Sequence, residues 1–403
     1  MTTSIALMLI LGLFFNYLFT KIKLPGLLGM LILGVLAGPY VFNILDPELL
    51  KISADLRKIA LIIILLRAGL GISRNDLNKV GSTALKFSCI PGIFEGFTIA
   101  FISTKILGFS FIEGGILGFI IAAVSPAVVV PQMLEFMEKK IGTNKGIPTI
   151  ILAGASIDDV FAITLFSTFL GLYSGNHVNI GIEIFKIPVS ILLGILSGVI
   201  IGLVMVWMFK KFHIRDTKKV ALILGSAIFL TVIENALKNK VEIAGLLGVM
   251  TIGFILLERI PNVAKRLSMK FNKMWVFAEI FLFVLVGSQV NISVAKDAGL
   301  KGLLVIFIGL LGRSVGVLVS TLGTNLNWKE RIFCMIAYVP KATVQAAIGA
   351  IPLSLGIPSG DVILAIAVLS ILVTAPLGAV FIKLSSNVLL EKEDIKNVKV
   401  KAV

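Results

Sequence analysis

The stretch that decides the fold is Gly154-Ala-Ser-Ile-Asp-Asp-Val-Phe161, which places two adjacent carboxylates inside an apolar run from residue 147 to residue 173. Such a run is long enough to cross a bilayer as a helix of ~20 residues. A carboxylate at the centre of a membrane helix costs ~2.5–3.5 kcal/mol on insertion scales, so buried carboxylates of this kind mark ion or proton pathways. Asp158 and Asp159 point ~100° apart on a helix and therefore face different surroundings.

The composition is that of a polytopic membrane protein. Of the 403 residues, 57% are hydrophobic and only 15% are charged, which is more apolar surface than a soluble domain can bury. The net charge of +15 could suggest nucleic acid as a partner. However, the lysines fall in short loops between apolar runs, as the positive-inside rule predicts for membrane proteins. We therefore expect the lipid bilayer, and no nucleic acid, as a partner.

Thirteen apolar segments are predicted to cross the membrane as helices. They cover residues 4–20, 25–43, 55–74, 83–106, 111–135, 147–173, 185–209, 217–237, 241–258, 273–292, 299–324, 329–353 and 361–384. An odd number of spans divides as six, one and six, so the two sets of six begin on opposite sides of the membrane and would be inverted repeats. The predicted organisation is a first repeat (1–174), a linker helix (175–211), a second repeat (212–386) and a tail (387–403).

The distribution of basic residues predicts the orientation. If the N-terminus lies outside the cell, 24 lysines and arginines fall on the cytoplasmic side and nine on the opposite side. Because basic residues accumulate in cytoplasmic loops, this ratio favours an outer N-terminus and a cytoplasmic C-terminal tail in the cell membrane.

Each half of the chain has a proline in the middle of its fifth helix. The first lies in Val124-Ser-Pro-Ala-Val-Val-Val-Pro131 and the second in Tyr338-Val-Pro-Lys-Ala-Thr-Val-Gln345. Proline removes a backbone donor and clashes with the preceding turn, so both helices are expected to unwind there. A single proline kink is common in membrane helices, whereas corresponding breaks in two halves point to the binding site of a transporter.

Five ionisable side chains are predicted near the middle of the membrane. They are Glu95, Asp158, Asp159, Arg313 and Lys341. Uncompensated, they would cost roughly 12–18 kcal/mol, which exceeds a typical folding stability of ~5–15 kcal/mol, so they must pair or face water. Three negative charges against two positive charges leave one surplus carboxylate. One monovalent cation or one proton neutralises it, which is the charge balance of cation/proton exchange.

Partners for these groups can be predicted in part. Glu95 and Arg313 lie on corresponding helices of the two halves and are expected to form a structural ion pair. Lys341, beside the second break, is expected to neutralise the negative end of a half-helix and to pair with Asp158. Ser125 and Thr343 have two open roles, because their hydroxyls could bind an ion or satisfy backbone groups freed at the breaks.

Three motifs, taken together, resemble motifs of the sodium/proton antiporters of the monovalent cation:proton antiporter superfamily. They are Ala153-Gly-Ala-Ser-Ile-Asp-Asp-Val160, Ser125-Pro-Ala-Val-Val-Val-Pro131 and Val339-Pro-Lys-Ala-Thr-Val-Gln-Ala-Ala347. The likeness covers essentially the whole membrane chain and is greatest to the bacterial relatives of the mammalian NHA-type exchangers. Residues 277–287 also resemble the tenth helix of that family.

This resemblance implies a fold of thirteen or fourteen helices in which broken helices 5 and 12 cross. It further implies a mobile core domain of helices 4–6 and 11–13 and a dimerisation domain of the remaining helices, in a homodimer. By motif, Asp159 would be the essential carboxylate for ion and proton, Asp158 its neighbour paired with Lys341, and Thr343 a nearby oxygen. Glu95 and Arg313 resemble an additional pair of the NHA-type branch.

The function favoured by the sequence is exchange of Na⁺ or Li⁺ for H⁺ by alternating access, with Na⁺ bound at Asp159 and Asp158 and no cofactor. K⁺/H⁺ exchange is the alternative of the same class. A cation channel is less favoured because no filter-like repeat or basic voltage-sensing helix is present. No enzyme activity is expected, because intramembrane aspartyl proteolysis needs aspartates on facing helices. Exchange would be electroneutral if Lys341 stays charged and electrogenic if it releases a proton, and the carboxylate beside it favours the first.

Overall fold

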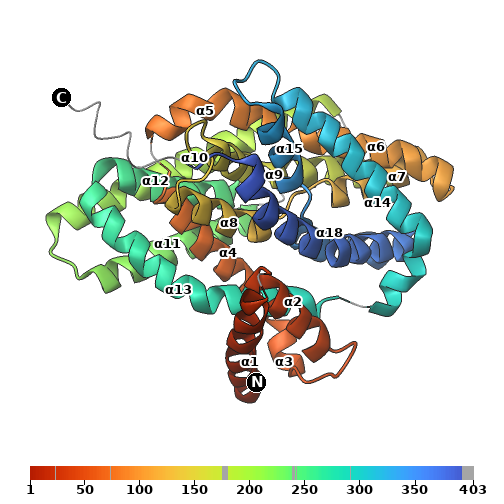
Figure 1. The fold of residues 1–403 in the computed structure, drawn as a ribbon, viewed down its shortest axis with the longest axis horizontal. Helices are drawn as coiled ribbons and strands as arrows, with labels where there is room; N and C mark the ends of the chain where they lie inside the picture. Colours follow the sequence, from red (N-terminus) through yellow and green to blue (C-terminus); the bar gives the residue numbers. More distant parts are fainter. Residues whose placement is uncertain are drawn as a thin grey trace.

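The computed structural model describes residues 1–22, 24–72, 74–174, 180–237, 241, 243–290 and 292–392. Every named element in these ranges is an α-helix (Figure 1), which confirms the predicted all-α class. The helices are α1 (Thr2–Lys21), α2 (Gly26–Ala37), α3 (Pro47–Lys51), α4 (Ser53–Gly69), α5 (Arg74–Phe87), α6 (Ile90–Ile106), α7 (Phe111–Ile121), α8 (Pro126–Glu138), α9 (Ile147–Tyr173), α10 (Ile180–Lys211), α11 (Asp216–Leu237), α12 (Gly245–Arg259), α13 (Pro261–Ser288), α14 (Ile292–Ser320), α15 (Trp328–Ala337), α16 (Thr343–Ile348), α17 (Ile351–Ser354) and α18 (Gly360–Leu389).

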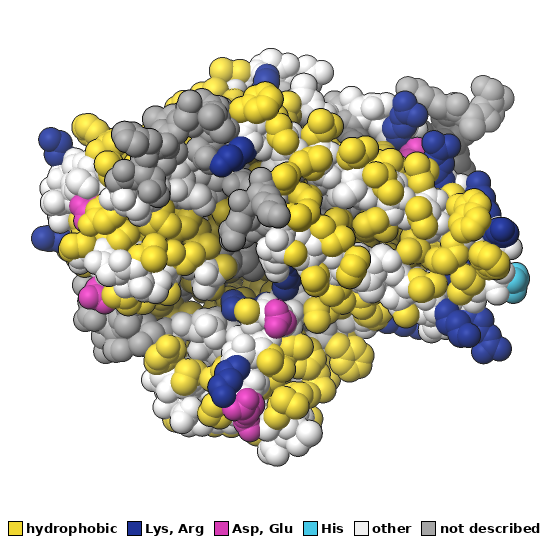
Figure 2. Space-filling view, turned by 180° about the vertical axis from the view of Figure 1, so that it is seen from behind, with side chains coloured by type: hydrophobic (Ala, Val, Ile, Leu, Met, Phe, Trp, Pro, Cys, Tyr) yellow, Lys and Arg dark blue, Asp and Glu magenta, His cyan; other side chains and the backbone are white. Residues whose placement is uncertain are grey.

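The long helices have the length and composition of membrane spans. Within the described ranges, nine helical stretches are long and apolar enough to cross a bilayer. Hydrophobic side chains also cover broad areas of the molecular surface, and several lysine and arginine side chains gather at one edge of it (Figure 2). An apolar exterior of this extent is stable only in lipid, so the chain is a multi-pass membrane protein.

The count of thirteen spanning helices is not confirmed. Four predicted segments are not among these nine stretches: α2 has 12 residues, α4 has 17, α12 has 15, and residues 329–353 are divided among α15, α16 and α17. A helix of 12 residues extends ~18 Å, whereas the hydrocarbon core is ~30 Å thick. The apolar runs overestimate helix length because turns such as residues 38–43 are themselves partly apolar.

Helix α13 begins earlier than the sequence indicated. It starts at Pro261, although residues before 273 were assigned to a basic loop. The buried side chains Ala264, Leu267 and Phe271 recur every three or four residues, which is the spacing of one face of a helix. Of the basic residues between them, Lys265 and Arg266 are exposed and Lys270 is partly exposed. A count of lysines and arginines alone therefore does not separate this helix from a loop.

Two parts of the predicted organisation lie partly outside the described residues. Residues 175–179 of the predicted linker and residues 393–403 of the predicted tail belong to them. The described part of the linker forms α10, and the tail region begins inside α18, which continues to Leu389.

Both predicted breaks are present and touch each other. In the first half, α7 ends at Ile121 and α8 begins at Pro126. In the second half, α15 ends at Ala337 and α16 begins at Thr343. The backbone N–H of Ser125 in the first break donates to the carbonyl oxygen of Pro340 in the second, at 2.8 Å. The two non-helical segments therefore cross inside the protein, where their free backbone groups have partners other than lipid.

Helix α9, which carries the two aspartates, lies between two groups of helices (Figure 1). In the first group, α6 packs against α7 and α14, and α14 packs against α18. In the second group, α13 packs against α2 and α4, and α12 packs against α4 and α10. Because α9 contacts α7 and α8 as well as α10 and α12, it lies at the boundary of the two groups.

Reciprocal glycine contacts bring α2 and α13 close together. A Cβ atom added to Gly34 of α2 would lie 2.1 Å from the carbonyl oxygen of Val284, and one added to Gly287 of α13 would lie 2.2 Å from that of Leu31. Small residues of this kind let membrane helices approach until their backbones touch. The pair of helices therefore depends on the missing side chains.

Substitution at this contact tests the fold. Gly34→Ala forces α2 away from α13, and we expect it to lower the free energy of unfolding by ~1–3 kcal/mol, the usual cost of overpacking. The measurement is thermal unfolding of the purified protein in detergent. The matched control is Gly225→Ala in α11, where an added Cβ meets nothing within 4 Å and stability should be unchanged or slightly raised. Equal melting temperatures for the two variants would contradict the described packing.

Candidate ion-binding site

Asp158 is held in the centre of the protein by the first helix break. Only 1% of its surface is exposed, and its Oδ2 atom accepts a hydrogen bond from the backbone N–H of Val124 at 2.7 Å. The same oxygen lies 3.3 Å from Nη2 of Arg313 on α14. The unwound segment between α7 and α8 thus supplies a free backbone donor to a carboxylate, as discontinuous helices of transporters do for anionic groups.

Three ion pairs join four buried charges into one network. The Oε2 atom of Glu95 on α6 accepts from Nε of Arg313 and, at 2.6 Å, from Nζ of Lys341 in the second break. Arg313 continues the chain to Asp158. All four side chains are at most 1% exposed. Two carboxylates and two cations therefore neutralise one another inside the protein, which offsets the cost of burying them.

The expected pairing of Lys341 with Asp158 is not what the structure shows. Lys341 contacts Glu95 instead, while the Oδ2 atom of Asp158 is taken by Val124 and Arg313. The physical reason is the position of α6, which brings a second carboxylate within reach of the ammonium group. By contrast, Glu95 and Arg313 lie in contact across the two halves of the chain.

Asp159 has no such partner. It follows Asp158 on α9 but forms no ion pair with any described residue, and its side chain is partly exposed. Its Oδ1 atom is buried and accepts no hydrogen bond. The surplus negative charge counted from the sequence therefore belongs to Asp159.

Several further oxygen atoms near the breaks are buried without a hydrogen-bond partner. They are Oδ1 of Asp158, Oγ of Ser125 and Oγ1 of Thr343. Two roles were considered for these hydroxyls, ion binding and hydrogen bonding to backbone groups freed at the breaks. In this structure neither the hydroxyl of Ser125 nor that of Thr343 forms such a backbone hydrogen bond. Their oxygens remain available as ligands for a hard cation such as Na⁺, which is bound by oxygen atoms.

Other side chains form hydrogen bonds with the backbone groups freed at the breaks, and the sequence analysis did not identify these residues. The Nε2 atom of Gln345 donates to the carbonyl oxygens of Ile120 and Ala123, each at 3.0 Å, at the end of α7. The hydroxyl of Thr374 on α18 accepts from the backbone N–H of Lys341 at 2.9 Å. A lone amide directly after a proline break in an apolar helix was the available signal for Gln345, whereas Thr374 becomes relevant only once α18 is placed beside the break.

An aromatic ring covers the arginine of the network. The guanidinium carbon of Arg313 lies 5.4 Å from the ring centroid of Tyr338, at the start of the second break. The face of an aromatic ring attracts a cation and supplies no competing hydrogen bond. The ring of Tyr338 also packs edge-to-face against the ring of Phe87, with 5.2 Å between the ring centroids, which restricts its position.

A cavity of about 380 Å³ lies toward one end of α9 and adjoins α4, α8 and α13. Its lining includes Thr149, Glu138 and Ser268, and Arg67 forms an ion pair with Glu138 at 2.7 Å. Thr149 precedes Asp158 by nine residues on α9, or ~14 Å along the helix axis. The polar cavity opens at the boundary of the two helix groups, on the side to which the basic loop residues 139–145 belong.

Comparison with known proteins identifies the family. The family model for "Sodium/hydrogen exchanger, transmembrane" matches residues 5–384. The chain belongs to the sodium/hydrogen exchanger family. The antiporter resemblance inferred from the three motifs is thereby confirmed, and the family consists of transporters and not of enzymes.

Individual exchangers match over most of their length. Sodium/hydrogen exchanger 9B2 of Mus musculus is 34% identical over 387 residues, which cover 92% of this chain and 69% of the mouse protein. Sodium/hydrogen exchanger 9B1 of Homo sapiens is 30% identical over 374 residues, which cover 88% and 70% of the two chains. Among solved structures, the sodium proton antiporter MjNhaP1 of Methanocaldococcus jannaschii superposes with a TM-score of 0.77 at 21% identity, over 96% of this chain and 97% of that one. This last likeness shows a shared fold.

The charge network predicts a specific pattern of stabilities. Neutralising one member of a buried ion pair leaves the other uncompensated, at a cost of ~3–5 kcal/mol. We therefore expect Glu95→Gln and Lys341→Gln each to lower the melting temperature in detergent, and the double variant to lose less than the sum of the two. Such non-additivity is the signature of direct contact in a double-mutant cycle.

The control cycle uses an exposed pair on the same protein. Lys51 and Glu48 form an ion pair at 2.7 Å with both side chains at least 66% exposed, so neutralising either should change stability little. Strictly additive losses for Glu95 and Lys341 would show that the two do not meet.

Proposed function

We propose that this protein exchanges Na⁺, or Li⁺, for H⁺ across the cell membrane by alternating access, with Asp159 as the carboxylate that both ions share. The observation that carries the proposal is the unpaired state of Asp159 beside a network of four charges that already balance. Membership of the sodium/hydrogen exchanger family supports it. A carboxylate without a resident cation can take one from solution, whereas a member of the network cannot do so without leaving a partner unpaired.

In this mechanism the deprotonated Asp159 binds the cation when its side of the protein is open to water. The Oδ1 atom of Asp158 and the hydroxyls of Ser125 and Thr343 are the further ligands that we assign to the site, because these buried oxygens have no other partner. Protonation of Asp159 releases the cation. The helix group carrying the site crosses to the other side only with Asp159 neutralised, since an uncompensated charge in a low-dielectric barrier is costly.

The network also favours exchange of one proton for one sodium ion. Lys341 has its own carboxylate partner in Glu95, and Asp158 is compensated by Arg313. Binding of Na⁺ at Asp159 therefore requires neither group to release a proton. On this basis we propose that exchange is electroneutral.

We assign the moving and stationary parts from helix packing. The first group together with α9, that is α5–α9 with α14–α18, holds every member of the network and would be the mobile core domain. Helices α1–α4 and α10–α13 would form the dimerisation domain of a homodimer. The cavity between Thr149 and Ser268 lies where these parts meet and would serve as the cytoplasmic approach to the site. We further propose that the N-terminus lies outside and the tail after α18 lies in the cytoplasm, because basic residues accumulate in cytoplasmic loops.

The direct test is the substitution Asp159→Asn in proteoliposomes. An amide can neither release a proton nor neutralise Na⁺, so we expect addition of Na⁺ or Li⁺ to no longer dissipate an imposed pH gradient. Unfolding temperature should be nearly unchanged because Asp159 makes no ion pair. Asp55→Asn, at an exposed aspartate of α4, is the matched control and should retain exchange.

Exchange by Asp159→Asn at a rate near that of the unmodified protein would contradict the proposed role. A comparison of Na⁺, Li⁺ and K⁺ in the same vesicles tests the substrate, and dissipation by K⁺ alone would replace Na⁺/H⁺ exchange with K⁺/H⁺ exchange.

A further inference from the structure

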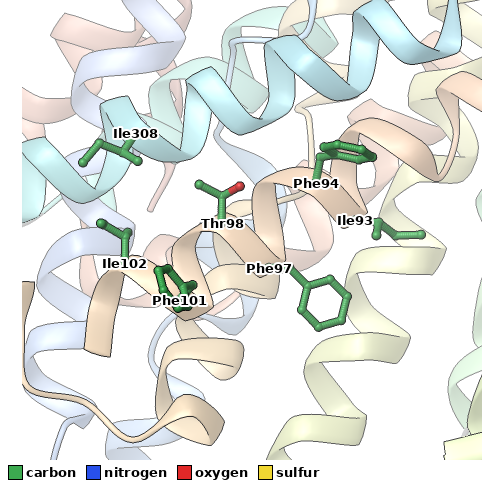
Figure 3. Close-up of a pocket in the computed structure, with 7 residues that line it drawn as sticks. All are labelled: Ile93, Phe94, Phe97, Thr98, Phe101, Ile102 and Ile308. Atoms are coloured by element: carbon green, nitrogen blue, oxygen red, sulfur yellow. The ribbon is translucent and has the colours of Figure 1, made fainter. Parts of the chain in front are cut away.

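A cavity of about 530 Å³ lies on the outer face of α6, beside α14, away from the ion site. Figure 3 shows its lining: Phe94, Phe97 and Phe101 project from α6, and Ile308 lies opposite on α14. The three phenylalanines are 38%, 43% and 61% exposed, so the cavity is a groove open to the surroundings. We call it the α6–α14 groove.

The α6–α14 groove has the dimensions and polarity of a site for one hydrocarbon chain. Its lining extends along α6 from Ile93 to Ile102, which corresponds to ~14 Å at 1.5 Å per residue. Half of the ~30 Å hydrocarbon core is ~15 Å, so the groove is about as long as one leaflet is thick. Thr98 contributes the one polar side chain of the lining.

Two lysines lie beyond the same end of the groove. Helices α6 and α14 run antiparallel, since Gly309 lies against Ile99 while Gly316, further along α14, lies against Pro91, earlier on α6. From the contact of Gly309 with Ile99, Lys105 is ~9 Å further along α6 and Lys301 is ~12 Å back along α14, by helical rise. Both side chains are exposed.

Among the side chains that the structure describes, no carboxylate forms an ion pair with either of these lysines. Lys105 instead lies 6.0 Å from the ring centroid of Phe101 in the groove. On the same predicted side of the membrane, Lys51 and Lys58 do have carboxylate partners, at 2.7 and 3.9 Å.

The acidic residue after α6 does not supply the missing charge. The carboxylate of Glu113 accepts hydrogen bonds from the backbone and side chain of Ser110, in the capping box that begins α7. At the Lys105 end of the groove, the described residues therefore supply positive charge without a matching anion.

We propose that the α6–α14 groove binds an anionic glycerophospholipid, with one acyl chain along Phe94, Phe97 and Phe101 and the phosphate between Lys105 and Lys301. An apolar groove of one leaflet's length, with two lysines at its headgroup end that no described carboxylate pairs, matches both parts of such a lipid. A zwitterionic lipid fits the apolar part but brings its own cation to the lysines.

The lipid would act on the two helices that hold the buried network. Glu95 follows Phe94 directly on α6, and Arg313 follows Gly312, whose added Cβ would lie 2.3 Å from the hydroxyl of Thr98 in the groove lining. A chain filling the groove would press α6 and α14 together from the lipid side. Binding should therefore stabilise the helix pair that carries Glu95 and Arg313.

The test is thermal unfolding of the purified full-length protein in detergent with phosphatidylglycerol or with phosphatidylcholine of the same acyl chains. For the unmodified protein we expect phosphatidylglycerol to raise the melting temperature by several degrees more than phosphatidylcholine. The double variant Lys105→Gln/Lys301→Gln should lose at least half of this difference. The control Lys51→Gln/Lys58→Gln removes the same charge from the same side and should keep it.

Native mass spectrometry of the same samples tests the groove itself. Ile102→Trp fills the groove while both of its lysines remain, and we expect it to retain fewer bound phosphatidylglycerol molecules than the unmodified protein. Equal stabilisation by the two lipids, or an undiminished difference in the Lys105/Lys301 variant, would overturn the proposal. Unchanged lipid retention by Ile102→Trp would overturn the assignment of the acyl chain to this groove.

Discussion

The structure depends on one carboxylate that serves two cations. Glu95 accepts hydrogen bonds from Arg313 of α14 and from Lys341 of the second helix break. It thereby compensates two positive charges that would be costly to bury alone in the membrane. Because Arg313 also reaches Asp158, the charges of α6, α9, α14 and the break are balanced as a unit. As a result, Asp159 is the one member of the five predicted charges that has no ion-pair partner among the described residues.

The broken helices make this arrangement possible at mid-membrane. Unwinding at Pro126 and Pro340 frees backbone groups, and several of these find polar partners through the Ser125–Pro340 contact and the amide of Gln345. Side chains from neighbouring helices perform this task, which leaves the hydroxyls of Ser125 and Thr343 unused. In transporters, unwound segments of discontinuous helices coordinate Na⁺ or H⁺ through oxygen atoms, so the unpaired hydroxyls beside these breaks are candidate ligands.

Much of this could be predicted from the sequence, because its strongest signals are local. The prolines predicted both breaks correctly, and two aspartates in an apolar run indicated the helix that carries the candidate site. Helix lengths were less predictable, because apolar turns lengthen the apolar runs of the sequence. In addition, the amphipathic start of α13 has the basic composition of a loop. The partner of Lys341 could not be predicted at all, because two carboxylates compete for it and only the placement of α6 decides between them.

The central claim is that Asp159 alone exchanges its proton for the cation. It is tested most directly by counting the protons released when saturating Na⁺ is added to the purified protein in weakly buffered detergent, over a range of pH. The network predicts a maximum of one proton per chain, and none from Asp159→Asn. Release of two protons per chain would contradict the account, because Lys341 or Asp158 would then have to leave the network when the cation binds.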